Sequence, residues 1–180
     1  MILDGYGFHE AYFKTDKWVH QQHLSPRLPW PGPHDYVLRV IDHGIGRAMW
    51  FVNGGDVERL TSMIKGFAPG RSGDLWCGAA LAASYAGGVD EEELVRFVKN
   101  SWDHRGEVAQ GAVFAIKQRV LSNLVTPHTE LAAQILCEMS AEDAAALTDP
   151  ARANLPEGSS IPAYEIFRQR IQSHFSVEGV

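Results

Sequence analysis

Apolar residues recur three and four positions apart along most of the chain. Between positions 37 and 52 they are Val37, Val40, Ile41, Ala48, Phe51 and Val52, which is the spacing of one face of an α-helix. Similar stripes, separated by glycine pairs, prolines and capping residues, predict further helices at 57–67, 75–86, 91–102, 107–124, 127–139, 141–148 and 163–175. The pattern therefore predicts an all-α protein with essentially no β-sheet.

Polar residues at the predicted helix starts are of the kind that cap helices. Asp56, Asp74, Asp90, Thr126 and Ser140 stand at these starts. At such a position a side-chain oxygen can accept a hydrogen bond from a free backbone N–H group of the first turn. We therefore expect each of the five to cap its helix.

Three glycines inside the predicted helices are evenly spaced. Gly46, Gly78 and Gly111 are 32 and 33 residues apart. Because a glycine within a helix costs about 1 kcal/mol relative to alanine, three at equivalent positions indicate that neighbouring helices approach closely there. Helix pairs with a period of about 33 residues are typical of helical-repeat proteins, which bury their faces by stacking. We expect residues 36–180 to form one such domain, an arc of stacked helix pairs with a concave face.

The first 35 residues have a different character. They are rich in aromatic residues and histidine, and four prolines lie between positions 26 and 33. Since proline cannot continue a helix and also restricts the residue before it, we expect residues 1–35 to be an irregular segment that ends in a stiff, extended connector.

Composition limits the classes of function. The 180 residues are 45% hydrophobic and 21% charged, as in globular proteins, and the net charge of −6 repels phosphate backbones, which argues against a nucleic-acid partner. No apolar run is long enough to span a membrane, and the first residues do not resemble a signal peptide. Only two cysteines are present, Cys77 and Cys137, so we expect a cytoplasmic protein without a disulfide framework.

Eight histidines raise the question of a metal site. None of them occurs in an HExxH or His-x-His motif, and no CxxC pair is present, so we expect no bound metal and no cofactor. Cys77 stands near a predicted helix start, where free N–H groups would favour a thiolate. Free cysteine is also among the residues most often buried, and a core position is the favoured interpretation of Cys77.

One polar motif lies in the first predicted helix of the repeat domain. In the segment Asp42-His-Gly-Ile-Gly-Arg47, His43 and Arg47 share a helix face because they are four residues apart. Arg47 could clamp a carboxylate of a ligand, or it could form a structural ion pair with Asp42 or Asp74.

A second polar motif, Thr126-Pro-His-Thr-Glu130, begins a later helix. Here His128 and Glu130 lie beside outward-pointing backbone N–H groups. They could serve as an acid–base pair, or Thr126 and Glu130 could simply favour helix entry while His128 faces solvent.

Several long strings in the chain are similar to one protein family. They are LDGYGFHEAYF at 3–13, DHGIGRAMWFV at 42–52, DLWCGAALAASYAGG at 74–88, AQGAVFA at 109–115, TPHTEL at 126–131 and PAYEIFRQR at 162–170. The chain thereby resembles the uncharacterised enediyne-biosynthesis-associated proteins, a domain of unknown function. The usual member is longer, and the chain resembles its C-terminal half. The resemblance implies a place beside an enediyne or similar polyketide synthase and supplies no reaction.

The motifs and the resemblance together suggest an accessory protein that binds or transforms an apolar polyene or polyketide intermediate. The candidate site residues are His9 or His128 as acid or base, Arg47 as anion clamp, Asp74 or Glu130 as orienting carboxylate, and Trp76 and Tyr164 as walls. We expect these residues to converge at one end of the stack. The alternative is a non-catalytic helical-repeat module that docks a partner protein of the same pathway. Whether the protein is an enzyme stays open at this point.

Overall fold

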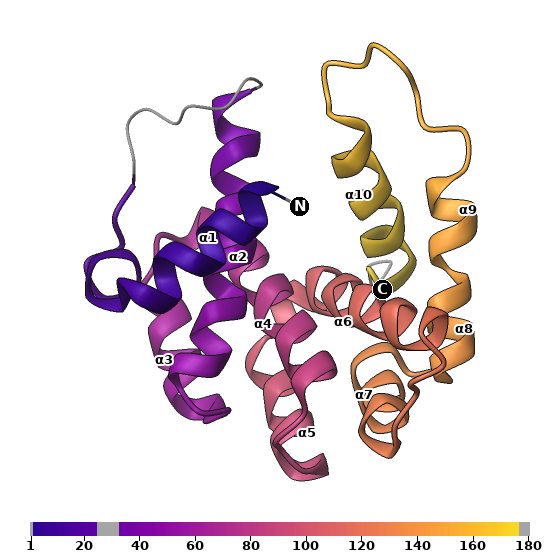
Figure 1. The fold of residues 1–180 in the computed structure, drawn as a ribbon, viewed down its shortest axis with the longest axis horizontal. Coiled ribbons are helices and arrows are strands. Elements are labelled where there is room, and N and C mark those ends of the chain that lie inside the picture. Colours follow the sequence, from indigo (N-terminus) through magenta and orange to yellow (C-terminus); the bar gives the residue numbers. More distant parts are fainter. Residues whose placement is uncertain (1, 25–32, 177–180) are drawn as a thin grey trace.

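The computed structural model describes residues 2–24 and 33–176. Within these ranges the chain is helical and has no β-strand (Figure 1), which confirms the all-α prediction. The α-helices are α1 (Ile2–Phe13), α2 (His34–Val52), α3 (Val57–Lys65), α4 (Ser72–Ala86), α5 (Glu91–Asn100), α6 (Arg105–Leu121), α7 (Pro127–Cys137), α8 (Ala141–Ala146), α9 (Thr148–Arg152) and α10 (Ala163–Phe175). Short turns of other helix types occur at Asp16–His20, Pro69–Arg71 and Trp102–His104.

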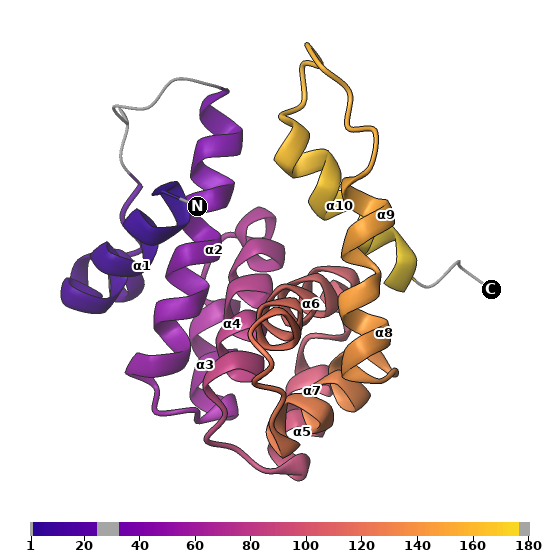
Figure 2. The ribbon, with the colours of Figure 1, turned by 45° about the vertical axis from the view of Figure 1, so that its right-hand side comes forward.

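The helices form two rows. Helices α2, α4 and α6 pack side by side in an inner row, with α1 against α2 at one end and α10 against α6 at the other. Helices α3, α5 and α7 form the outer row (Figure 1). Figure 2 shows α1 and α2 on one side of the molecule and α9 and α10 on the opposite side. Of the expected helix pairs α2/α3, α4/α5 and α6/α7, the last packs closely within the pair, and the repeat itself stays a prediction.

Glycines set the close spacing of the inner row. A Cβ atom on Gly78 of α4 would lie 1.9 Å from the carbonyl oxygen of His43 in α2. On Gly46 it would lie 2.0 Å from the carbonyl oxygen of Leu75, and on Gly111 of α6 it would lie 2.1 Å from that of Cys77. The predicted close approach at the three spaced glycines is therefore confirmed.

Four of the five predicted caps are present. The side chains of Asp56, Asp90, Thr126 and Ser140 each accept a hydrogen bond from the backbone N–H group three residues on. The prediction for Asp74 is wrong, because α4 begins at Ser72 and Asp74 lies within its first turn. Its buried carboxylate instead faces two guanidinium groups, with which it forms ion pairs.

The N-terminal segment also departs from expectation. Residues 2–13 form α1 instead of an irregular segment. The small residues Gly7 and Ala11 are buried, and a Cβ atom on Gly7 would lie 2.2 Å from the carbonyl oxygen of Ile41, so the backbone of α1 rests directly on α2. A helix that packs through small residues carries a weak apolar stripe, which is why periodicity missed it. The predicted proline-rich connector lies mostly outside the described residues.

No helix within residues 2–24 and 33–176 combines the length and the apolar character that a bilayer crossing requires.

Candidate functional site

A pocket of about 530 Å³ lies where the inner row faces α9 and α10. Its apolar wall is formed by Leu81 of α4, Phe114 and Leu121 of α6, and Tyr164 and Phe167 of α10. The rings of Phe114 and Phe167 are stacked, with centroids 5.3 Å apart. Pockets of this size hold small molecules, and an aromatic wall suits a flat, unsaturated ligand.

One end of the pocket is polar because α1 and α2 cross at glycines. A Cβ atom on Gly44 would lie 2.1 Å from the carbonyl oxygen of Asp4, so the two backbones are in direct contact. This contact places Asp4 Oδ1 2.6 Å from His43 Nδ1 and Asp4 Oδ2 3.0 Å from Arg47 Nη1. All three side chains line the pocket, and the ring of Phe8 lies beneath the Arg47 guanidinium, 4.9 Å away.

The environment of His43 favours its protonated form. Burial alone would lower its pKa, but the interaction with the Cys77 side chain and the hydrogen bond and charge of Asp4 outweigh burial and raise the pKa to about 9. Burial would raise the pKa of Asp4, yet its hydrogen bond to His43 and the nearby Arg47 charge hold that pKa below the ordinary value. At neutral pH this end of the pocket therefore holds two cations and one carboxylate.

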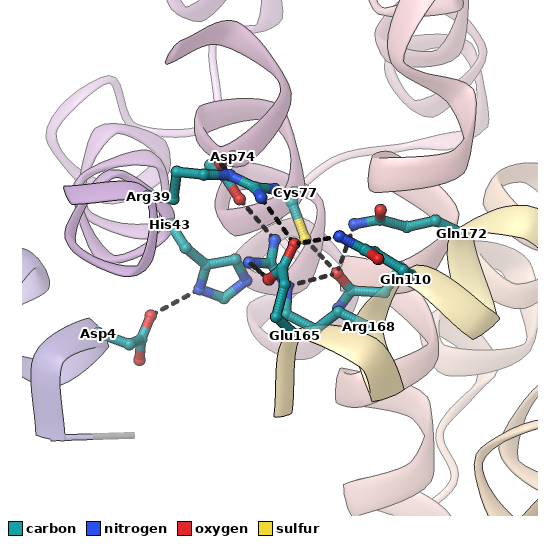
Figure 3. A network of polar contacts seen from close by, with 10 residues as sticks. Asp4, Arg39, His43, Asp74, Cys77, Gln110, Glu165, Arg168 and Gln172 are labelled. Carbon is teal, nitrogen blue, oxygen red and sulfur yellow. Dashed lines mark hydrogen bonds and ion pairs between the residues drawn. The ribbon is translucent and has the colours of Figure 1, made fainter. Parts of the chain in front are cut away.

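Cys77 lies on the inner side of His43, away from solvent. The thiol is completely buried and donates a hydrogen bond to Gln110 Oε1 at 3.1 Å. The same oxygen accepts from Arg168 Nε at 3.0 Å and from Gln172 Nε2 at 3.2 Å (Figure 3). Two buried nitrogens nearby, His43 Nε2 and Gln110 Nε2, have no hydrogen-bond partner of ordinary geometry within the described residues.

A buried charge network fixes α10 on the inner row. Arg168 donates to Asp74 Oδ1 at 2.6 Å and to Glu165 Oε2 at 3.2 Å. Arg39 of α2 donates to Asp74 Oδ2 at 2.8 Å and to Glu165 Oε1 at 2.7 Å. The two carboxylates and the thiol raise the pKa of Arg168 above its ordinary value despite burial, so this guanidinium stays charged. Figure 3 shows these side chains meeting between α2, α4, α6 and α10.

Two of the seven predicted site residues lie in this pocket. Arg47 and Tyr164 both line it, and the pKa of Tyr164 is raised above its ordinary value, chiefly by burial. Asp74 lies behind it in the charge network. The expected structural partners of Arg47 were wrong, because Arg47 pairs with Asp4 while Asp42 pairs with Arg71 at 2.6 Å.

The other four predicted residues lie elsewhere, so the expected convergence is not found. His9 is on the exposed side of α1, 3.5 Å from Glu10. His128 donates through Nε2 to the Ala83 carbonyl oxygen at 2.8 Å, and Glu130 accepts from the Ala141 N–H group at 3.1 Å. These two contacts join helix ends. Trp76 is a core residue packed edge-on against Phe97, not a pocket wall.

Sequence reasoning missed Asp4, Gln110 and Arg168. The shared face of His43 and Arg47 was a usable signal, and in the structure both side chains do face the same carboxylate. Asp4 was overlooked because its segment was expected to be irregular. Gln110 and Arg168 belong to helices that are far apart in the sequence, and no local sequence pattern predicts the hydrogen bond between them.

The fold and the pocket define an all-α protein with a ligand-sized cavity that ends in a buried polar cluster. The sequence profile of a family of proteins of unknown function, DUF1702, matches residues 1–175. The chain belongs to this family. The match covers nearly the whole chain and does not single out a C-terminal half. Comparison with curated proteins and with solved structures found no match.

Proposed function

We propose that the protein serves enediyne or related polyketide biosynthesis as an accessory protein that binds an apolar polyene or polyketide intermediate with an anionic end. The place in the pathway rests on the resemblance of the long sequence strings. The single observation that carries the binding role is the pocket, where an aromatic wall meets the cluster of Asp4, His43 and Arg47.

The wall suits a conjugated chain. Phe114, Tyr164 and Phe167 contribute three rings within 6.3 Å of one another, and Leu81 and Leu121 extend the apolar surface. Flat π-systems stack on such rings with a gain beyond that from area burial alone. A saturated chain of equal length would lose that part of the attraction.

The charges of the pocket favour an anion. Its lining carries four cations and two carboxylates, namely His43, Arg47, Lys117 and Arg152 against Asp4 and Asp149. Lys117 is paired with Asp149 at 2.9 Å, and Arg47 with Asp4. The whole chain has a net charge of −6, so a positive pocket is a local feature that would attract an anionic headgroup.

Fluorescence titration with a conjugated tetraene fatty acid tests the proposal. Wild-type protein is expected to bind the acid more tightly than its methyl ester. Phe114→Ala is expected to weaken binding of both by about tenfold or more, since a phenyl ring that the ligand covers contributes about 1.5–3 kcal/mol. Arg47→Gln is expected to weaken binding of the acid and leave the ester unaffected. Trp102→Ala, on a different face, is the matched control. Saturable binding that Phe114→Ala does not change would refute the proposal.

The alternative role, docking of a pathway protein, is favoured by a different observation. A groove between α5 and α7 is lined by Val95, Val98, Trp102 and Ile135, and Trp102 is 57% exposed. Exposed tryptophan beside aliphatic residues is typical of binding hot spots. If docking is the role, Trp102→Ala abolishes association with the pathway partner while the affinity for the tetraene acid stays at the wild-type value.

A further inference from the structure

The charged residues that line the pocket fall into two groups. The His43 end consists of Asp4, His43 and Arg47, and the Lys117 end consists of Lys117, Asp149 and Arg152. We propose that the ligand is an apolar chain with an anionic group at both termini, one bound at the His43 end and the other at the Lys117 end. This inference rests on the proposed function and names the class of its ligand.

The two ends lie far apart because different parts of the inner row supply them. The His43 end is built from α1 and α2, whereas the Lys117 end is built from α6 and α9. Helix α4 packs between α2 and α6, and Figure 2 shows α1 and α2 on one side of the molecule and α9 on the opposite side. Since the axes of packed helices are about 8–10 Å apart, two such intervals separate α2 from α6 by roughly 16–20 Å.

The surface between the two ends is apolar and aromatic. Leu81 and Tyr85 of α4 line it, together with the stacked rings of Phe114 and Phe167. All charged residues of the pocket lining, within the described ranges, belong to one end or the other. A ligand anion halfway along the pocket would therefore have no counter-charge from the lining, and desolvating it there would be costly. The pocket thus favours ligands whose charges lie at their termini.

The His43 end carries an excess of one positive charge. Asp4 alone faces both the imidazolium of His43 and the guanidinium of Arg47. Arg47 contacts Asp4 through Nη1, and no residue among 2–24 and 33–176 accepts a hydrogen bond from its Nε or Nη2 atoms. A guanidinium binds a carboxylate or a phosphate through two nitrogens at once. Arg47 can therefore hold one anionic group of the ligand and keep its pairing with Asp4.

The Lys117 end carries the same excess of positive charge. Lys117 Nζ donates to Asp149 Oδ1 at 2.9 Å. This hydrogen bond lowers the pKa of Asp149, and the charge of Arg152 contributes to the same effect. The Arg152 side chain forms no ion pair or hydrogen bond with the part of the chain that the structure describes. One carboxylate thus faces two cations, and Arg152 is left for the second anion of the ligand.

The two ends differ in exposure to solvent. The side chains of His43 and Asp4 are 8% and 15% exposed, whereas that of Asp149 is 74% exposed. Because water and salt screen exposed charges, an anion should be bound more strongly at the His43 end. A ligand with a single anionic group is therefore expected to place it there, and a second anionic group should add a smaller gain at the Lys117 end.

The test is fluorescence titration with conjugated α,ω-dicarboxylic acids of increasing chain length and with their monomethyl esters. A dicarboxylate that reaches both ends is expected to bind about fivefold more tightly than its monoester, which is the gain that an exposed ion pair can give. Shorter dicarboxylates should bind no more tightly than their monoesters. A threshold in chain length is what two anion sites at a fixed distance predict.

One variant at each end separates the two sites. Arg152→Gln is expected to weaken binding of the long dicarboxylate by about three- to fivefold and to leave the monoester unaffected. Arg47→Gln is expected to weaken binding of both ligands. Arg59→Gln is the matched control, because it makes the same change in net charge on α3, where its side chain is 75% exposed and lies outside the pocket lining. It should change neither affinity.

The second anionic group of the ligand is either a carboxylate or a phosphate ester. A probe with a carboxylate at one terminus and a phosphate monoester at the other distinguishes them. Tighter binding than that of the dicarboxylate, removed by Arg152→Gln, would identify a phosphate. Weaker binding would identify a carboxylate. Either result supports a ligand that is anionic at both termini.

The inference is refuted if no dicarboxylate of the series binds more tightly than its monoester, or if Arg152→Gln weakens binding of the monoester and the dicarboxylate equally. Monoester binding that depends on Phe114 and Arg47, without a gain from the second carboxylate, would leave the proposed function standing. Dicarboxylate binding that Arg152→Gln weakens but Phe114→Ala does not would remove the aromatic binding role and keep the two anion sites.

Discussion

The closest helix contact in the inner row can be tested by adding one methyl group. In Gly78→Ala the new Cβ atom would lie 1.9 Å from the His43 carbonyl oxygen and 2.9 Å from the Arg47 nitrogen. Both neighbours are backbone atoms, so no side-chain rotation relieves the overlap, and α2 and α4 must separate by about 1.5 Å to restore ordinary contact. Overpacking of this kind costs about 1–3 kcal/mol and sometimes more.

We expect the upper part of that range for Gly78→Ala, even though alanine favours the helix by about 1 kcal/mol over glycine. In a chain of this length a loss of 2–3 kcal/mol lowers the melting temperature by roughly 4–12 °C. Thermal unfolding followed by circular dichroism at 222 nm measures it. Because the displaced carbonyl belongs to His43, tetraene binding should weaken as well.

Gly5→Ala is the matched control. Gly5 lies in α1, and a Cβ atom there would have nothing within 4 Å, so alanine should raise stability by about 0.5–1 kcal/mol. If Gly78→Ala and Gly5→Ala both melt at or above the wild-type temperature, the inner row is not held at its spacing by glycine contacts.

Three further outcomes follow from the structure. The pKa of His43 is about 9 in the folded state and about 6.5 in the unfolded state, so the contribution of protonated His43 to folding stability is complete below pH 6.5 and lost as pH rises through 9. Thermal melts across this range should show a falling melting temperature. His43→Gln should abolish this pH dependence. Arg168→Met should cost about 3–5 kcal/mol in urea unfolding because Asp74 loses a buried partner, whereas an unchanged midpoint would mean that the network does not hold α10. Asp90→Ala should cost about 1 kcal/mol, since it removes the hydrogen bond to the Glu93 N–H group; an unchanged melting temperature would show that the cap is dispensable.

Local sequence determined most of the secondary structure. The helix starts at Asp56, Asp90, Thr126 and Ser140 follow from capping chemistry that acts within four residues, and the structure has each of these caps. The spaced glycines likewise predicted close helix packing. A glycine inside a helix lowers helix stability relative to alanine, and close approach of a neighbouring helix is the reason to keep one there. Helix α1 was missed because its backbone rests on α2 at Gly7, and a contact through small residues leaves only a weak hydrophobic stripe.

Tertiary structure alone decided the composition of the site. Asp4 and His43 belong to two different helices, and their contact depends on where Gly7 and Gly44 let the backbones of α1 and α2 cross. Arg168 reaches Asp74 across 94 residues of sequence, a distance over which no local pattern operates. Asp74 shows the competition directly: its sequence position suits a helix cap, but two guanidinium groups brought in by folding stabilise a buried carboxylate more than one backbone N–H group does. Helix caps and close helix contacts could therefore be predicted from the sequence. The pairing of charged side chains could not, because it depends on which helices pack together.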